Sequence, residues 1–307
     1  MDYRRLFLTL IFTISVFLLW EGWGQHKAEQ KAAVVAATQA TDAPTGSVDL
    51  RAKDGNAVPA RSNGNSAKAV NQSAAVVNAP TVTVKTDEFV ATISLAGASV
   101  TNLELIKHKG DDQAGYVELF GKTHNYAAQS GLIGDGMPNH KTLWRQVSTG
   151  NELKAGQNSL DVVFEADAAN GGKVTKTLTF KRGEYGIDVT YRLKGAAADK
   201  TDAYFQIVRD DKSPSGDPRM VSVFTGPAVY TDAQKFQKIK FADIADGSAK
   251  FEKTANDGWV AMIQHYFVTA YLPAAGTPRE FYTRQVEPGV FAAGVIVPMP
   301  AAKDGVS

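Results

Sequence analysis

Alternation of apolar and polar residues limits the fold of this chain more than any other pattern, and it is clearest between Tyr185 and Leu193. Every second residue of this segment is apolar: Tyr185, Ile187, Val189, Tyr191 and Leu193. Because successive side chains of a strand point to opposite faces, the pattern predicts a strand with one buried face. In the preceding segment the apolar residues Val174, Leu178 and Phe180 share one parity. Lys181–Glu184 separates the two segments and contains Gly183, so the sequence predicts a β-hairpin.

Similar short runs recur from residue 81 onward, with glycine- and proline-rich turns between them. They are Thr81–Lys85, Phe89–Leu95, Val100–Leu105, Tyr116–Phe120, Leu160–Glu165, Tyr204–Val208, Val221–Thr225, Ile239–Phe241, Phe281–Val286 and Val290–Val297. Many short strands with few helical patterns are typical of a β-sandwich. We therefore expect residues 81–307 to form one large, mainly β, antiparallel β-sandwich with two big sheets.

The least polar stretch of this region runs from Trp259 to Leu272. Both parities are apolar, which is expected for a single strand covered on both faces, but a buried helix has the same composition. The β-branched and aromatic residues of the stretch, and Pro273 at its end, favour the strand.

An uncharged apolar run extends from Leu6 to Trp20, with Arg4 and Arg5 before it and Trp23 after it. As a helix it would be about 22 Å long, and an interfacial turn behind it brings it near the ~17 residues that a membrane span needs. The two arginines predict a cytoplasmic N-terminus, and the two tryptophans suit the headgroup level. A cleaved signal peptide has the same basic start and apolar core, so these residues leave both a retained anchor and a cleaved signal open.

Residues 25–80 differ from everything around them. They contain no Phe, Tyr, Trp or Ile, and Leu50 is their single leucine. Such a segment buries too little apolar surface to offset the entropy of ordering it, so we expect a disordered linker of about 40 Å average span.

The composition excludes several functional classes. The chain has 33 basic and 32 acidic side chains, for a formal charge of +1, so there is no reason to expect nucleic acid as a partner. Because it has no cysteine, it has no disulfide, no thiolate catalyst and no cysteine-ligated metal. We find no second apolar run long enough to cross a membrane.

No catalytic, metal or cofactor site is predicted. The histidines are His26, His108, His124, His140 and His265, and none forms a short-spaced ligand pair. His265 is expected to be buried and hydrogen-bonded within the sheet. Asp111-Asp112 and Asp210-Asp211 lack the spaced oxygen ligands of a calcium loop, so we expect solvated turns. Gly131–Gly136 lacks the lysine of a phosphate-binding loop.

Several motifs together resemble the YidC-type membrane protein insertases of Gram-negative bacteria. In chain order they are Leu18–Glu21 with Trp23, Tyr126–Leu132 with its Gln-Ser-Gly-Leu, Phe180–Tyr185 with its Lys-Arg-Gly-Glu-Tyr, Lys238–Phe241 with Ile244–Asp246, and Gly258–Met262 with Gln264, Tyr266 and Phe267.

This resemblance implies a retained inner-membrane anchor over residues 1–24, a linker over 25–80 and a periplasmic, mutarotase-like β-supersandwich over 81–307. It also implies a non-enzymatic role in inserting and folding nascent inner-membrane proteins, alone or with the Sec translocon and its accessory subunits. In that reading Arg4, Arg5, Trp20 and Trp23 orient the anchor in the lipid bilayer.

The resemblance covers only part of such a protein. The family's further five membrane spans have no counterpart here, so we expect a fragment, with a sandwich lacking its last strands and an exposed, aggregation-prone edge. The alternative is a membrane-anchored periplasmic carbohydrate-binding or sugar-mutarotase-like module.

Overall fold

The hairpin predicted from the alternation is present in the computed structural model, which describes residues 58–61, 79–110, 115–168, 171–195, 201–212 and 224–300. All of them belong to the unit Asp49–Ser307. Strands β8 (Lys173–Lys181) and β9 (Ile187–Lys194) pair antiparallel, and Gly183 in their turn has φ 73°. The apolar parity of both strands faces the core, as expected.

The largest sheet has nine strands, all in antiparallel pairs. Its order is β1 (Thr81–Lys85), β2 (Phe89–Ser94), β3 (Ser99–Lys109), β5 (Ala127–Ile133), β10 (Asp202–Asp210), β17 (Val290–Pro298), β16 (Arg279–Glu287) and β13 (Thr254–Ala255), with β4 (Tyr116–Phe120) on β3. The last strand along the chain, β17, lies inside this sheet, between β10 and β16. Strands distant in sequence therefore form the middle of the sheet.

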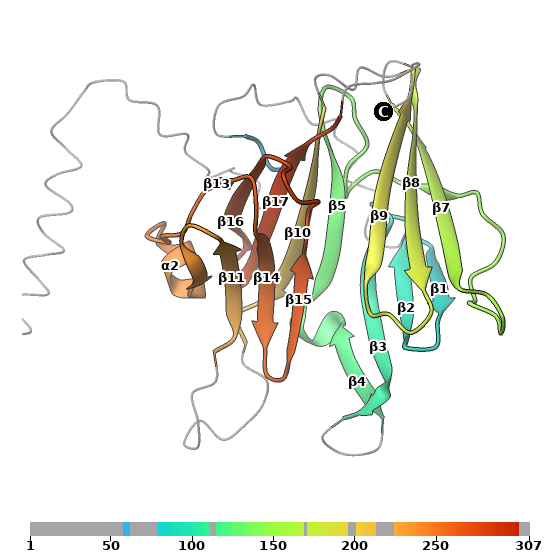
Figure 1. The fold of residues 1–307 in the computed structure, drawn as a ribbon, viewed down its shortest axis with the longest axis horizontal. Coiled ribbons are helices and arrows are strands. Elements are labelled where there is room, and N and C mark those ends of the chain that lie inside the picture. Colours follow the sequence, from blue (N-terminus) through green and yellow to red (C-terminus); the bar gives the residue numbers. More distant parts are fainter. Residues whose placement is uncertain are drawn as a thin grey trace, which may run out of the picture. The chain divides into compact units, whose positions relative to one another are not determined.

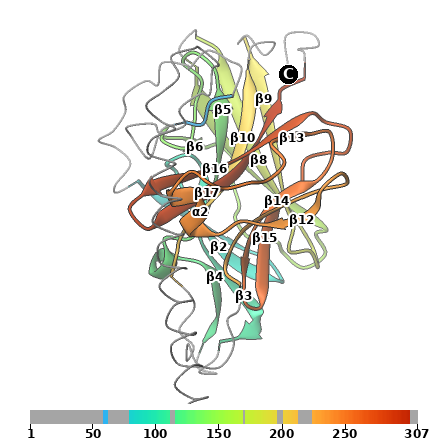
Figure 2. The ribbon, with the colours of Figure 1, turned by 90° about the vertical axis from the view of Figure 1, so that its left-hand side faces the viewer.

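Two four-stranded sheets form the second layer. The first, called here the β9 sheet, has the order β6 (Arg145–Gln146), β7 (Ser159–Asp167), β8 and β9; the second, the β15 sheet, has the order β12 (Lys235–Lys238), β11 (Gly226–Thr231), β14 (Trp259–Gln264) and β15 (Phe267–Tyr271). Figure 1 shows them side by side in front of the large sheet, and Figure 2 shows the same layers turned by 90°. The helical segments of the described residues are η1 (Lys122–His124) and α2 (Phe241–Ala245).

One hydrophobic core lies between the layers. The large sheet contributes Val84, Ile93 and Val295, β7 and β8 contribute Phe164 and Phe180, and β14 contributes Val260 and Met262. Burial of this apolar area supplies the main driving force for the fold. The predicted mainly β antiparallel sandwich is thus confirmed.

The second layer differs from the expectation of two big sheets. It consists of two separate small sheets. The next strand along the chain after β9 is β10, and the next after β15 is β16, and both β10 and β16 belong to the large sheet. Neither small sheet therefore receives a further strand at that edge.

The prediction of one strand over Trp259–Leu272 was wrong. The run forms two strands, β14 and β15, which pair through a turn at His265 and Tyr266. A single strand over the whole run would be about 45 Å long. It would exceed the longest described strand, β3, which has 11 residues. The expected cover on both faces holds for β14, where Val260, Ala261 and Met262 are all buried. It fails for β15, where Val268 is exposed.

One shorter predicted strand needs correction, and another is described only in part. Ile239–Phe241 is not a strand: β12 ends at Lys238, and Phe241 begins α2, where Phe241 and Ile244 are buried three residues apart on one helix face. Of Val221–Thr225, residues 221–223 lie outside the described part, and the next strand, β11, begins at Gly226.

Within the described ranges, no helix has the length and apolar character required to cross a lipid bilayer.

Candidate interaction site between the two small sheets

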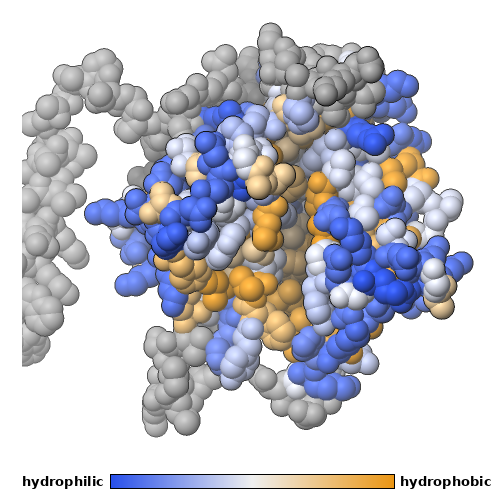
Figure 3. Space-filling model, viewed as in Figure 1, coloured by the Kyte–Doolittle hydropathy of each residue, from blue (hydrophilic) through white to orange (hydrophobic). Residues whose placement is uncertain are grey.

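The edge strands of the two small sheets, β9 and β15, face each other over the middle of the large sheet (Figure 1). The space-filling view shows the surface hollowed between these sheets, with apolar residues in and beside the hollow (Figure 3). We call this feature the groove. Its walls are β9 and β15, and its floor is formed by β5 and β10, the paired strands of the large sheet that lie behind them in Figure 1.

A row of aromatic rings crosses the floor of the groove. Phe205 of β10 lies in the middle, with its ring centroid 6.3 Å from Tyr191 of β9 and 5.3 Å from Tyr271 of β15. Residues from three strands thus form one continuous row of rings, in which Tyr191 is buried and Phe205 and Tyr271 are partly exposed. The partly exposed rings suit an apolar partner better than a charged one.

Neighbouring residues of β5 connect both walls to the large sheet. Ser130 Oγ lies 2.8 Å from the Tyr191 hydroxyl, and the Tyr271 hydroxyl donates to the Gln129 carbonyl at 3.2 Å. Burial raises the pKa of Tyr191 and of Tyr271 above the usual value of a phenol. Both phenols therefore stay neutral, and they serve to hold β9 and β15 in place.

His108 of β3 closes one end of the groove. Its ring centroid is 5.9 Å from Tyr185 on the β9 side and 5.9 Å from Phe267 on the β15 side, and its Nε2 lies 3.1 Å from the Tyr185 hydroxyl. A hydrogen bond to Glu88, which is also ion-paired with Lys107, raises the pKa of Tyr185. This end of the groove is therefore more polar than the aromatic row.

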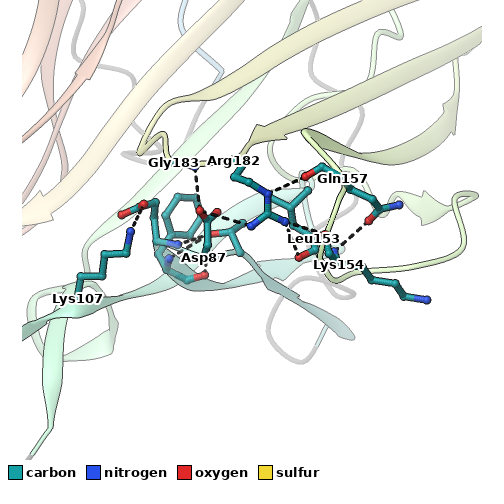
Figure 4. A network of polar contacts seen from close by, with 10 residues as sticks. Asp87, Lys107, Leu153, Lys154, Gln157, Arg182 and Gly183 are labelled. Carbon is teal, nitrogen blue, oxygen red and sulfur yellow. Dashed lines mark hydrogen bonds and ion pairs between the residues drawn. The ribbon is translucent and has the colours of Figure 1, made fainter.

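The turn between β8 and β9 is fixed by a second polar network (Figure 4). The guanidinium of Arg182 donates to the carbonyls of Gln157 at 2.8 Å and Lys154 at 2.7 Å. Asp87 accepts from the Gly183 amide at 3.0 Å and lies 3.7 Å from Arg182 Nη1. The Lys-Arg-Gly-Glu-Tyr motif found in the sequence is thus a structural anchor of the β9 wall.

The predicted anchor residues Arg4, Arg5, Trp20 and Trp23 lie outside the described residues. The sequence did not identify the aromatic row of the groove. Tyr191 has the parity of a buried residue, but Tyr271 was assigned to the same strand as Trp259, and nothing local connects either of them to Phe205.

The expectation for His265 was wrong. It is exposed in the turn between β14 and β15, because the run forms a hairpin there instead of continuing. Among the histidines that the structure describes, the buried one is His140, whose Nδ1 hydrogen-bonds with the Tyr204 hydroxyl. Burial raises the pKa of Tyr204 well above its usual value.

The expectation of a solvated turn fails at Asp210. This residue is buried at the end of β10, and its Oδ1 lies 3.2 Å from His124 Nδ1. Asp111 and Asp112 are outside the described part of the chain. Among the residues that the structure describes, no group of three or more His, Cys, Asp or Glu side chains is arranged to hold a metal ion.

Comparison with known proteins agrees with the motifs. The family model of the YidC periplasmic domain matches residues 81–305. A "Membrane protein insertase YidC" of Dechloromonas aromatica (strain RCB) is 46% identical over 310 residues, which are 99% of this chain and 55% of that protein. The protein of the same name from Aromatoleum aromaticum is 42% identical, covering 100% of this chain and 56% of its own length. The chain therefore spans about half the length of the curated relatives it matches.

Solved structures that align with this chain include two proteins named for sugar-related activities. A galactose mutarotase-like protein from Lactobacillus casei ATCC 334 is 11% identical with a TM-score of 0.39, covering 74% of this chain and 94% of its own. A putative aldose 1-epimerase from Escherichia coli K12 is 9% identical with a TM-score of 0.40, covering 74% of this chain and 96% of its own.

Proposed function

The chain belongs to the YidC family of membrane protein insertases, and from this membership we propose that it is the membrane-anchored periplasmic part of a protein that inserts and folds inner-membrane proteins. The observation that carries the proposal is the similarity to named insertases over nearly the whole chain. It favours this function over a membrane-anchored sugar-binding module. In this proposal the chain acts by binding other molecules and not by catalysing a reaction.

We propose the domain arrangement that the sequence predicts. Residues 1–24 are a retained anchor with its N-terminus in the cytoplasm, residues 25–80 are a flexible linker, and the sandwich from residue 81 is periplasmic. The match of the periplasmic family model to residues 81–305 supports this arrangement. A linker of this length keeps the groove near the bilayer while leaving it free to turn.

The partners in this proposal are newly made inner-membrane proteins, the lipid bilayer, and the Sec translocon with its accessory subunits. The apolar floor of the groove suits the first of these, because an unfolded membrane protein exposes apolar segments before it enters the bilayer.

The topology is testable with single cysteines, because the chain has none of its own. Thr83→Cys, at an exposed position of β1, should react with a membrane-impermeant maleimide in spheroplasts, whereas Asp2→Cys should react only after the membrane is opened. The opposite labelling would refute the arrangement.

The activity requires an insertion assay. Cells depleted of their own insertase would receive the whole protein that contains this chain, and a test inner-membrane protein would be followed by protease protection. We expect insertion to be restored. Unchanged insertion in the presence of a correctly folded, membrane-bound protein would exclude the insertase function.

A further inference from the structure

All but one of the free sheet edges formed by the described residues are protected, in different ways. Edge strands expose unpaired backbone groups, and natural proteins block them with charges, prolines, bulges or very short strands. Strands β6 and β13 have two residues each. Charged residues lie on β1 (Lys85), β4 (Glu118), β9 (Asp188, Arg192, Lys194) and β12 (Lys235, Lys238).

Strand β15 has none of these protections. Its sequence is Phe-Val-Thr-Ala-Tyr, without charge or proline, and its register with β14 is regular from Gln264↔Phe267 to Val260↔Tyr271. No described strand pairs with its other side. Exposed apolar side chains are concentrated here: Tyr266 is 82% exposed, Val268 59% and Leu272 72%.

The two faces of β15 define what a partner strand would meet. Tyr271 and Phe267 point toward the large sheet, where Tyr271 packs on Phe205. Val268, the next residue along, points to the opposite face with Leu272, because side chains of a strand alternate. A strand added beside β15 would therefore have one face on the aromatic row and the other beside exposed aliphatic residues, so both of its faces should be apolar.

The position of β15 limits the size of the partner. Its free side faces β9 across the groove (Figures 1 and 3). A single extended chain fits beside an edge strand at about 4.8 Å. A second folded sheet would meet β9, so the arrangement disfavours pairing between two copies of this chain. Because unpaired amides and carbonyls need hydrogen-bonding partners, a polypeptide also suits this edge better than lipid does.

We propose that β15 binds an extended, uncharged, apolar segment of a client polypeptide by strand addition in the groove. Main-chain hydrogen bonds along such an edge give affinity, and alternate side chains give selectivity. The identity of the client as a membrane protein rests on the proposed function, whereas strand addition itself rests on the unprotected edge.

The test uses the full chain in lipid nanodiscs and a synthetic peptide with an apolar core as long as β15 and lysines at its ends. Amide hydrogen exchange of β15 is followed as the peptide is added, with empty nanodiscs correcting for peptide bound to lipid. We expect saturable protection of β15 amides. A peptide N-methylated at alternate residues of its core should protect at least about tenfold less, because it lacks the donors for the new ladder.

Two variants provide the matched comparison. Val268→Lys places a charge on the unprotected edge and should weaken peptide binding about tenfold or more. Val147→Lys changes another exposed valine, 42% exposed and outside the groove, and should leave binding unchanged. A Val268→Lys chain that unfolds would be recognised by lost protection of β8, and Leu272→Lys, at a 72% exposed position at the end of the same face, would then replace it with the same expected loss of binding.

Several results would overturn the proposal. These are equal binding by both lysine variants, equal binding of the N-methylated peptide, protection of β15 that rises with chain concentration alone, and protection produced by lipid alone. The last two would identify a second copy or the bilayer as the occupant of the edge. None of them bears on the insertion assay, so strand addition and the insertase function fail separately.

Discussion

Lys176 is a buried lysine whose positive charge, when present, opposes folding. It lies on β8 with 1% of its surface exposed, and its Nζ donates to the carbonyls of Gly97 at 2.9 Å and Ala98 at 2.8 Å. The same atom is 5.7 Å from the centroid of the Tyr191 ring. Burial lowers the pKa of Lys176 from 10.5 to about 7. We predict that this residue makes the stability of the sandwich depend on pH.

The direction follows from proton binding. Between the folded pKa of about 7 and the unfolded pKa of 10.5, the unfolded chain binds a proton on Lys176 that the folded chain does not. The free energy of unfolding therefore rises with pH across this window. Below pH 7 both states bind the proton, so the destabilisation is complete and constant. A pKa difference of one corresponds to about 1.4 kcal/mol, which predicts a rise of ~3 kcal/mol from pH 7 to 9.5.

The assay is urea unfolding of the chain between pH 6 and 9.5, followed by the fluorescence of the buried Trp144. Other groups titrate too, so the quantity of interest is the difference between the unmodified chain and Lys176→Met. This difference should change by ~3 kcal/mol over the window in favour of the unmodified chain as pH rises. Lys173→Met, at an exposed position of the same strand, should show no such change. A pH-independent difference for Lys176→Met would show that burial does not lower the pKa of Lys176.

Three further substitutions test the contacts around the groove. Ser130→Ala leaves the buried Tyr191 hydroxyl without its partner and should lower the free energy of unfolding by about 1–3 kcal/mol. Urea titration measures this loss, and adding Tyr191→Phe should restore part of it. Arg182→Ala removes the hydrogen bonds that fix the β8–β9 turn and should speed amide exchange there, whereas Arg145→Ala breaks only a surface ion pair and should change stability by less than about 1 kcal/mol. Gly131→Ala would place a Cβ 2.7 Å from the Tyr204 hydroxyl and 2.6 Å from the Asn139 Cα. We therefore expect the free energy of unfolding to fall by more than about 3 kcal/mol in thermal unfolding. An unchanged melting temperature would contradict the packing described.

Two of the errors of prediction share one origin, and a third has another. Trp259–Leu272 is apolar on both parities, so its sequence does not show where the chain turns. Phe241 and Ile244 did carry a helical spacing, but the run is too short to distinguish from a strand by pattern alone. His265 follows from the first error, because a turn residue is exposed where a mid-strand residue would be buried.

The sequence alone was enough to predict strands β8 and β9 and the turn between them, because alternation specifies which side chains face the core and Gly183 permits the turn conformation. Its motifs also indicated the family. Only the tertiary structure decided that the second layer is split, that β15 is the unprotected edge, and that Gln129 and Ser130 hold the two walls of the groove. Ser130 and Tyr191 are 61 residues apart, and Gln129 and Tyr271 are 142 apart. Contacts between residues so distant in sequence depend on how the sheets stack, and no local sequence pattern carries that information.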